Sequence, residues 1–315
     1  MADVTVGMVG VGPMAGLHVR AIGEVEGLKV ASCMSRSLER AQAFAARHGI
    51  ERPRTLEDFR RDPGVDALWV VAPADAMADA AIQLSGLGLP MFLEKPVGLD
   101  PGETRRARER IAVPNMVGLN RRFYEVVQHG VELAQAAGGV RAIEVHMPED
   151  VGPDAPANAP AIQAQWQFAN SVHLVDLFRL FGGEVAEISS MNAVRSQADR
   201  SFASLLRFEG GATGIYNAQW FAPGPWRVTV YADDLCLIYQ PIEQLTVVRR
   251  PRLTEVVTPR GADTRAKPGL AGQAAAFRDL VRTGRLPPAA VDLADYERSV
   301  ALVDALTRAG RQGIG

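Results

Sequence analysis

A strand-like run closed by glycines opens the chain and limits what it can fold into. Residues 4–9 (VTVGMV) are apolar and mostly β-branched, Gly10 and Gly12 follow directly, and residues 14–25 carry apolar side chains at helical spacing. Glycine permits a tight turn from a strand into a helix and a close approach of a ligand to the backbone. The pattern predicts the first strand, turn and helix of a parallel βαβ unit.

Short apolar runs and helical segments alternate through the first 120 residues, which is typical of a doubly wound parallel sheet. Further strands are predicted at 28–35, 66–73, 90–96 and 115–120. Beyond about residue 140 the strands lengthen and are joined by tight turns, which predicts a large open mixed or antiparallel sheet. We therefore predict an α/β protein with a Rossmann domain at 1–120 and an α+β domain at 121–315.

Composition restricts the class of partner. The 315 residues include 34 basic and 36 acidic side chains, and this net charge of −2 indicates neither a nucleic acid nor an anionic membrane as partner. Cys33 and Cys236 lie far apart in apolar runs, so no disulfide framework or metal site is indicated and both are expected to be core thiols. No stretch reaches the roughly eighteen apolar residues of a membrane span, which favours a cytoplasmic protein that binds a small neutral or anionic molecule.

The glycine turn predicts a dinucleotide site. Ala15 stands where the third glycine of the usual fingerprint would be. The free N–H groups and the dipole of the following helix favour a pyrophosphate at this point. The predicted contacts are Gly10, Gly12, Pro13 and Met14.

The end of the second strand predicts which dinucleotide binds. An acidic residue there would accept hydrogen bonds from a ribose 2′-hydroxyl, but the chain has Ser35, Arg36 and Ser37, with no carboxylate before Glu39. Arginine pairs with a 2′-phosphate and serine donates to phosphate oxygens, so NADP is favoured and NAD is the alternative. Ser37 can equally be the N-cap of a helix that begins at Leu38.

A lysine stands at the end of the strand predicted at 90–96, in the stretch MFLEKPVG. Only three lysines, Lys29, Lys95 and Lys267, occur among the 34 basic residues. A lysine can change its protonation when desolvated, which arginine does not, and Pro96 biases Lys95 toward an extended backbone at the carboxyl edge of the sheet. Lys95 is therefore a candidate to hydrogen-bond a reacting oxygen.

The stretch NSVHLVDLFRLFGG predicts a helix over 171–181 with Asn170 as its N-cap. This places His173 in the first turn, where the helix dipole would keep the imidazole neutral and able to accept a proton near pH 7. Asp176 can orient His173 or pair with Arg179 on the surface. Asn170 can be a simple cap or can hold a substrate hydroxyl.

With GVGPMAGLH, SRSLERA, WVVAP, EKP and GLNRRF in this order and spacing, the sequence resembles the Gfo/Idh/MocA family of oxidoreductases, and the resemblance covers nearly the whole chain. It implies hydride transfer between NAD or NADP and a hydroxyl or ketone of a sugar, nucleotide sugar or cyclic polyol. It also implies that Lys95 is catalytic beside the nicotinamide and that His173 transfers the proton. The second domain would then bind the substrate.

The third strand's end departs from the family pattern. The family commonly has Thr-Pro-Asn and then a histidine there, whereas this chain has Ala72, Pro73, Ala74 and Asp75. Ala72 and Pro73 are therefore expected to contact the cofactor through their backbone. Glu94, beside Lys95, is a further expected cofactor contact.

Other candidates flank the expected crevice. Arg122 and Tyr124 follow the strand at 115–120, where one arginine is expected to face the ligand. Trp166 can stack on a sugar face, although packing is the default for a tryptophan. The stretch 148–165 is rich in proline and alanine without periodicity, which predicts a long loop of the kind that often acts as a lid.

A second departure concerns the acid–base machinery. The family usually carries an aspartate four residues before the histidine, and this chain has Ala169. Two alternatives therefore stay open: a cofactor-binding sensor or assembly protein without turnover, and a reductase of a non-sugar carbonyl or imine. A homodimer or homotetramer is expected, because too few helices follow residue 185 to cover both faces of so large a sheet.

Overall fold

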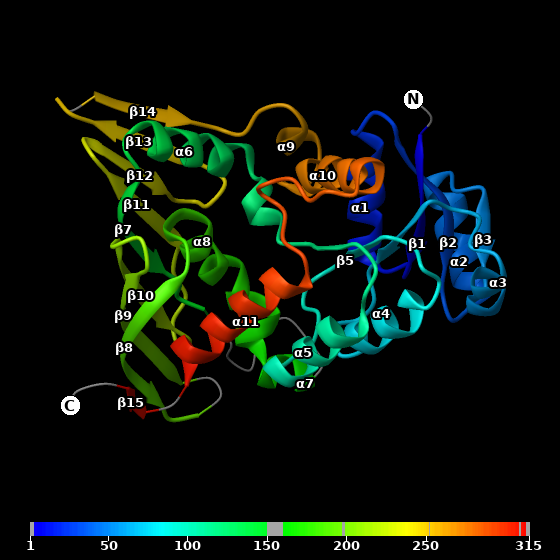
Figure 1. The fold of residues 1–315 in the computed structure, drawn as a ribbon, viewed down its shortest axis with the longest axis horizontal. Coiled ribbons are helices and arrows are strands. Elements are labelled where there is room, and N and C mark those ends of the chain that lie inside the picture. The colour runs from blue at the N-terminus through cyan, green and yellow to red at the C-terminus, as the bar shows by residue number, and fades with distance from the viewer. Residues whose placement is uncertain (1–2, 150–159, 197–198, 252, 309, 313–315) are drawn as a thin grey trace. The chain divides into compact units, whose positions relative to one another are not determined.

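The computed structural model describes residues 3–149, 160–196, 199–251, 253–308 and 310–312 (Figure 1). The chain divides into two compact units: unit 1 comprises Met1–Phe123 and Arg260–Glu297, and unit 2 comprises Tyr124–Pro259 and Arg298–Gly315. The first division lies close to the predicted boundary at residue 120. The segment Arg260–Glu297, which the sequence-based division placed in the second domain, belongs to unit 1.

Unit 1 is built on a six-stranded parallel sheet in the order β3-β2-β1-β4-β5-β6. The strands are β1 (Val4–Val9), β2 (Leu28–Met34), β3 (Arg52–Arg54), β4 (Ala67–Val70), β5 (Met91–Leu93) and β6 (Asn115–Val117). The intervening helices are α1 (Pro13–Gly23), α2 (Leu38–His48), α3 (Leu56–Arg61), α4 (Met77–Ser85) and α5 (Pro101–Arg110). The predicted doubly wound parallel sheet is confirmed, and its strand order reverses beside β1, where such sheets bind ligands.

The edge strand β3 is not predicted by the sequence, because Pro53 stands in its middle. Proline lacks the N–H that a central strand needs, and an edge strand tolerates it. The strands predicted at 66–73 and 90–96 are shorter in the structure, where β4 ends at Val70 and β5 at Leu93. The residues beyond these ends leave the sheet at its carboxyl edge.

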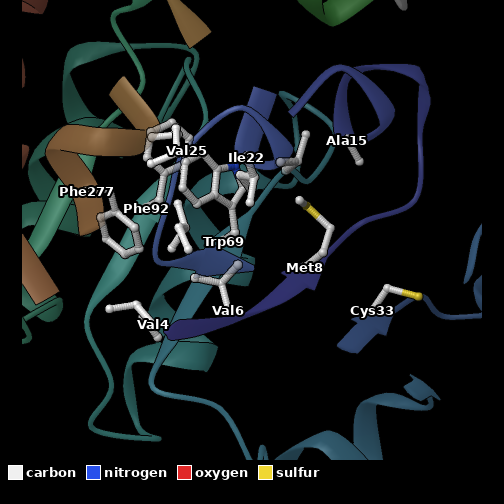
Figure 2. Packing of buried hydrophobic residues seen from close by; sticks show 14 of the residues in the cluster. Val4, Val6, Met8, Ala15, Ile22, Val25, Cys33, Trp69, Phe92 and Phe277 are labelled. Atoms are coloured by element: carbon white, nitrogen blue, oxygen red, sulfur yellow. The ribbon is translucent and has the colours of Figure 1, made fainter. Parts of the chain in front are cut away.

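A helix from near the end of the chain completes the core of unit 1. Phe277 of α10 (Leu270–Thr283) packs edge-on against Trp69 and Phe92, with ring centroids 5.4 and 5.8 Å away, and these two rings stack at 3.8 Å (Figure 2). All three side chains are fully buried. Full burial of one such ring stabilises the fold by about 1.5–3 kcal/mol, which explains why α10, preceded by α9 (Ala262–Arg265), belongs to this unit.

Unit 2 contains a nine-stranded sheet in the order β14-β13-β12-β11-β7-β10-β9-β8-β15. The strands are β7 (Val140–His146), β8 (Val185–Val194), β9 (Arg200–Phe208), β10 (Thr213–Gln219), β11 (Arg227–Ala232), β12 (Leu235–Tyr239), β13 (Leu245–Arg249), β14 (Leu253–Val257) and β15 (Gly310–Gln312). Only the β7–β10 pair among these neighbours is parallel, so the predicted large mixed sheet is confirmed. The helices of this part of the chain are α6 (Glu125–Ala136), α7 (Pro160–Ala164), α8 (Val172–Gly182) and α11 (Leu293–Thr307), and the boundary between the units falls inside α11.

Helix α8 packs against β7 and is buried on most sides, which its nearly continuous apolar sequence requires. On the opposite face of the sheet, Leu205 of β9 and Ile215 of β10 are register partners and are 62% and 45% exposed. This sheet face is therefore apolar at its centre.

Two sequence-based expectations are revised here. The long loop predicted at 148–165 falls partly outside the described residues, and 160–164 forms helix α7 rather than loop. Cys33 is a core thiol as expected, and burial raises its pKa to about 11, whereas Cys236 is only partly buried. Within the described ranges, no helix has the length and apolar character needed to cross a membrane.

Candidate functional site

A cavity of about 530 Å³ lies in unit 1 at the carboxyl ends of β1, β2 and β4. This is the edge at which a doubly wound sheet binds a nucleotide. Eight of the predicted cofactor contacts line it: Gly10, Gly12, Pro13, Met14, Ser35, Arg36, Ala72 and Pro73.

The two glycines of the turn fit a pyrophosphate for different reasons. Gly10 has φ +102°, and a Cβ there would lie 2.1 Å from the carbonyl oxygen of Val71, so the turn out of β1 requires glycine. A Cβ at Gly12 would meet no atom within 4 Å, so the space beside this backbone is open for a ligand. Gly12 is the N-cap of α1 and Pro13 its first residue, which leaves N–H groups of the first turn for an anion.

One wall of the cavity is basic. Ser35 and Arg36, two of the predicted cofactor contacts, line it, and Arg40 of α2 and Arg60 of α3 line it as well, although the sequence did not single them out. Ser37 is the N-cap of α2 and accepts a hydrogen bond from the backbone N–H of Arg40 at 3.3 Å. The capping alternative for Ser37 is thus confirmed.

Little negative charge opposes these arginines. Asp79 also lines the cavity, but its carboxylate pairs with Arg106 at 2.7 Å. Arg60 donates to the neutral side chain of Gln83 at 2.9 Å. Arg36 and Arg40 are exposed and form no ion pair with any described residue. The cavity therefore carries a surplus of positive charge at the side where the second strand ends.

Glu94, which precedes the candidate lysine, is anchored in the core of unit 1. Its Oε2 lies 3.0 Å from Nε2 of His18, a fully buried residue of α1 that packs against Trp69 and Phe92. An ionised Glu94 would accept this hydrogen bond, with Nε2 of His18 as its donor. This contact holds the strand end that presents the half-buried Lys95 at the carboxyl edge of the sheet.

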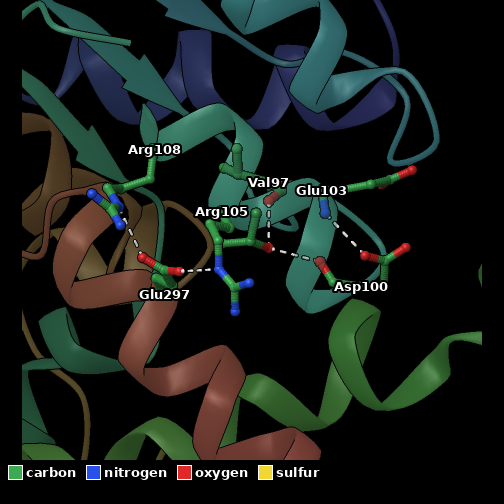
Figure 3. A network of polar contacts seen from close by, with 7 residues as sticks. Val97, Asp100, Glu103, Arg105, Arg108 and Glu297 are labelled. Atoms are coloured by element: carbon green, nitrogen blue, oxygen red, sulfur yellow. Dashed lines mark hydrogen bonds and ion pairs between the residues drawn. The ribbon is translucent and has the colours of Figure 1, made fainter. Parts of the chain in front are cut away.

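The chain that follows Lys95 is held by polar contacts at the start of α5 (Figure 3). Asp100 is the N-cap of α5 and accepts from the backbone N–H of Glu103 at 2.9 Å, while Glu103 accepts a backbone N–H of the preceding loop at 2.8 Å. Thr104 donates to the carbonyl oxygen of Val97 at 2.9 Å. These bonds fix the loop between Lys95 and the helix.

Arg122 and Tyr124 are largely buried. Arg122 is 7% exposed in the 3₁₀ turn Asn120–Phe123 of unit 1, and Tyr124 is 3% exposed at the N-cap of α6, where unit 2 begins. Both stay proposed substrate contacts.

The helix that carries His173 begins earlier than predicted. A π-helical turn at Gln167–Ser171 precedes α8 directly, so Asn170 lies inside a helical turn and is not an N-cap. The N–H groups of this turn already donate to carbonyl groups of preceding residues, for example from Ala169 to Gln165 at 3.1 Å. His173 is thus not at a free helix end, and the helix dipole expected there does not act on it.

Asp176 belongs to a buried network. It is 1% exposed and accepts from the hydroxyl of Ser299 at 2.6 Å, and that hydroxyl accepts from Arg179 at 2.8 Å. Arg179 also pairs with Glu184 at 2.5 Å. Asp176 and Arg179 therefore share Ser299 as a hydrogen-bond partner inside the protein rather than on the surface, and the orientation of His173 by Asp176 stays a prediction.

One carboxylate of unit 2 was not foreseen. Glu149 is 5% exposed, and its oxygens accept hydrogen bonds from the side chains of Trp166, Asn170 and Ser171, the last two at 2.8 and 2.7 Å. Two predicted substrate contacts, Trp166 and Asn170, are therefore brought together on Glu149. The sequence signal that could have indicated Glu149 is the alternation of the preceding strand, in which every second residue is apolar and Glu149 continues the apolar face.

Models of one protein family match both units. The model described as "Oxidoreductase family, NAD-binding Rossmann fold" matches residues 4–115, and the "GFO/IDH/MocA C-terminal domain" matches residues 132–237. The chain belongs to the Gfo/Idh/MocA family of oxidoreductases. The resemblance seen in the sequence is thereby confirmed, and the glycine-lined cavity lies within the NAD-binding part of the family model.

Relatives of this Gfo/Idh/MocA protein include the rhizopine catabolism protein MocA of Rhizobium meliloti, 30% identical over 145 residues that cover 45% of this chain and 44% of the relative. The scyllo-inositol 2-dehydrogenase (NAD(+)) of Bacillus subtilis (strain 168) is 31% identical over 122 residues, covering 37% of this chain and 35% of that one. The chain spans 44–66% of the length of the first three curated relatives. A solved levoglucosan dehydrogenase in complex with NADH has the same fold, with a TM-score of 0.79, 18% identity and 96% coverage of each chain.

Proposed function

We propose that the protein is an NADP-preferring oxidoreductase that interconverts a secondary hydroxyl and a ketone of a sugar, nucleotide sugar or cyclic polyol. The observation that carries the proposal is the cavity in unit 1, which joins the glycine turn to a wall with three arginines. The relatives named for inositol and levoglucosan support the substrate class.

The preference for NADP rests on charge. Arg36, Arg40 and Arg60 reach the cavity from three different elements, and its acidic residue Asp79 is paired with Arg106. A 2′-phosphate would provide a negative charge to pair with these arginines. Charge-assisted hydrogen bonds from guanidinium groups to phosphate are stronger than hydrogen bonds between neutral groups. A ribose with a free 2′-hydroxyl would instead need a carboxylate at the end of β2, where Ser35 and Arg36 stand.

The proposed chemistry uses two side chains of the protein, Lys95 and His173. The nicotinamide, when bound, accepts or donates the hydride. Lys95 would hydrogen-bond the reacting oxygen, which stabilises negative charge on that oxygen as the carbonyl forms or is reduced. His173 would hold the proton that leaves or joins the same oxygen. Asn170, Trp166, Arg122 and Tyr124 are the proposed contacts to the rest of the substrate.

The test is a turnover screen with both cofactors. Purified protein is given NADP⁺ or NAD⁺ with scyllo-inositol, levoglucosan or a UDP-hexose, and NADPH with non-sugar ketones, while the absorbance of the reduced cofactor is followed. Turnover of at least one polyol or sugar, faster with NADP⁺, is expected. Cofactor binding without any turnover would favour a sensor, and turnover confined to non-sugar ketones would favour the alternative reductase.

We also propose a homodimer or homotetramer formed through the open face of the unit 2 sheet. Leu205 and Ile215 stand opposite each other at the centre of that face, and Met191 of β8 is 64% exposed. A second copy would remove this apolar surface from water. Arg207 and Glu187 form an ion pair on the neighbouring strands, so both signs of charge are present for a self-complementary contact.

A further inference from the structure

Glu149 occupies a position at which the fold would place an apolar residue. Along β7 and its continuation, Ile143, Val145 and Met147 are buried, and alternation puts Glu149 on the same face, against which α8 packs. The ladder extends to this point, because the backbone N–H of Glu149 donates to the carbonyl oxygen of Gln219 at 2.7 Å. The side chain therefore points from the end of the strand toward the beginning of α8.

A carboxylate at such a position costs free energy unless several donors compensate it. Here one side-chain oxygen accepts from Trp166 and from Asn170 at 2.8 Å, and the other accepts from Ser171 at 2.7 Å. All three donors come from a single stretch, the π-helical turn and the residue before it. Turns of this type are frequent at functional sites.

This arrangement is adjacent in sequence to the proposed proton carrier, His173. Ala169 precedes His173 by four residues, a spacing that keeps two residues near one face of a helix, and Asn170 follows Ala169 directly. The carboxylate of Glu149 thus accepts a hydrogen bond from the residue next to the position at which the family usually carries its own aspartate. In this chain Ala169 is small and 7% exposed, so it supplies no charge there.

We propose that Glu149 supplies the carboxylate that Ala169 lacks, as a positioning residue that orients Asn170 toward the substrate and places a negative charge beside His173. The inference deepens the proposed function, since it concerns the same site. Glu149 would act through Asn170 and His173 and would not touch the reacting atoms.

Two consequences follow for the chemistry. Because Nδ2 of Asn170 donates to a group that only accepts, the Oδ1 of the same amide faces away from Glu149 and can accept a hydrogen bond from a substrate hydroxyl. A negative charge near an imidazole favours its protonated form, so Glu149 would stabilise His173 after it takes up a proton.

Further charged and titratable groups in the described part of unit 2 come from α8 and β10. Asp176 and Arg179 follow on α8 and are engaged with Ser299. Tyr216 comes from β10, and its burial, with the charge of Glu149 as a second cause, raises the pKa of the Tyr216 hydroxyl. Tyr216 stays neutral at ordinary pH, and among the described residues Glu149 contributes a negative charge to this turn from the strand side.

The first experiment moves the carboxylate from one element to the other. Glu149→Gln keeps the shape and removes the charge, and it is expected to lower kcat with the best substrate of the turnover screen by about tenfold or more, with a smaller change in KM. Adding Ala169→Asp to Glu149→Gln is expected to recover at least about threefold of that loss, which a purely structural role of Glu149 would not permit. Glu144→Gln, the same change on the other face of β7, is the matched control and should leave kcat unchanged.

The second experiment needs no substrate. The imidazole signals of the protein with bound NADP⁺ are followed by NMR against pH, with His173 assigned through its loss in His173→Asn. Glu149→Gln is expected to lower the pKa of His173 by about one pH unit relative to wild type, and Glu144→Gln is expected to leave it unchanged. An unchanged pKa of His173 in Glu149→Gln would overturn the inference.

The two experiments separate this inference from the proposed function. Turnover in the screen with no effect of Glu149→Gln on kcat or on His173 would keep the proposed function and reject the role of Glu149. Absence of turnover would reject the proposed function, while the titration of His173 still decides the role of Glu149. Should Glu149→Gln fail to fold, a crystal structure of the wild-type protein decides the point, because Nδ2 of Asn170 must lie within about 3.2 Å of a Glu149 oxygen.

Discussion

Cofactor selectivity should depend on the three arginines of the cavity wall. Arg36 and Arg40 are exposed, and Arg60 is held by Gln83. A hydrogen bond to a charged group contributes about 1.5–3 kcal/mol when buried, whereas an exposed ion pair contributes about 0.2–1 kcal/mol. A bound 2′-phosphate would partly cover the exposed Arg36 and place its contribution between these limits, so Arg36→Ala should weaken NADP⁺ binding by about 1–1.4 kcal/mol, roughly five- to tenfold. NAD⁺ binding should change by less than about twofold, because NAD⁺ lacks the 2′-phosphate.

The same electrostatic reasoning predicts how strongly the wild-type protein prefers NADP⁺ over NAD⁺ and which substitution reverses this preference. NADP⁺ is expected to bind at least about tenfold more tightly than NAD⁺, a difference of about 1.4 kcal/mol. Arg36→Asp introduces a charge that repels the phosphate and can accept from a ribose 2′-hydroxyl, so it should reverse the preference.

Titration calorimetry with both cofactors measures these differences directly. The preference for NADP⁺ should shrink when salt is raised from about 0.1 M to about 1 M, because the Debye length falls from about 10 Å to about 3 Å. Arg47→Ala is the matched control, since Arg47 is an exposed arginine on the last turn of the same helix α2 and does not line the cavity. Equal dissociation constants of wild type for NADP⁺ and NAD⁺, or a loss as large in Arg47→Ala as in Arg36→Ala, would refute the electrostatic explanation.

Three further predictions follow from the geometry. Gly10→Ala should lower the melting temperature by several degrees, since an alanine held at the positive φ of residue 10 costs about 1–3 kcal/mol. Gly12→Ala should keep the melting temperature but weaken the binding of both cofactors. The reverse pattern would contradict the fit of the turn to a pyrophosphate. Lys95→Ala should lower kcat by about a hundredfold or more with little change in cofactor affinity, and a wild-type kcat in this variant would place the chemistry elsewhere. The double variant Leu205→Glu, Ile215→Glu should sediment as a 33.9 kDa monomer, whereas the wild-type protein should sediment as a larger species. A wild-type protein that sediments at 33.9 kDa at micromolar concentration would refute the oligomer.

The nucleotide-binding unit could be predicted from the sequence because the motifs that define it are local. The turn at Gly10 and Gly12 lies between a strand and a helix that are adjacent in sequence, so glycine spacing and periodicity describe it completely. The end of β2 is equally local, and Ser35 and Arg36 do line the cavity. Arg40 and Arg60 were missed because they reach the same cavity from helices whose packing onto the sheet no short motif encodes.

The helix before His173 shows the limit of reading caps from sequence. Asn170 has the residue type and the position of an N-cap, yet the preceding residues are helical and already satisfy the backbone donors. The apolar pattern of α8 gave the helix correctly, but it held no information on whether the chain before it would be a free end.

What the sequence alone determined is the order of elements, the fold class and the turn that fits a dinucleotide, because each depends on residues within one or two turns of one another. What only the tertiary structure decided is which distant segments meet. Phe277 completes the core of unit 1 from near the end of the chain, and Glu149 meets Ser171 across 22 positions. Burial free energy depends on the surface that the rest of the fold offers, and a buried carboxylate is stable only where other elements bring donors to it, so neither contact is encoded in a local pattern.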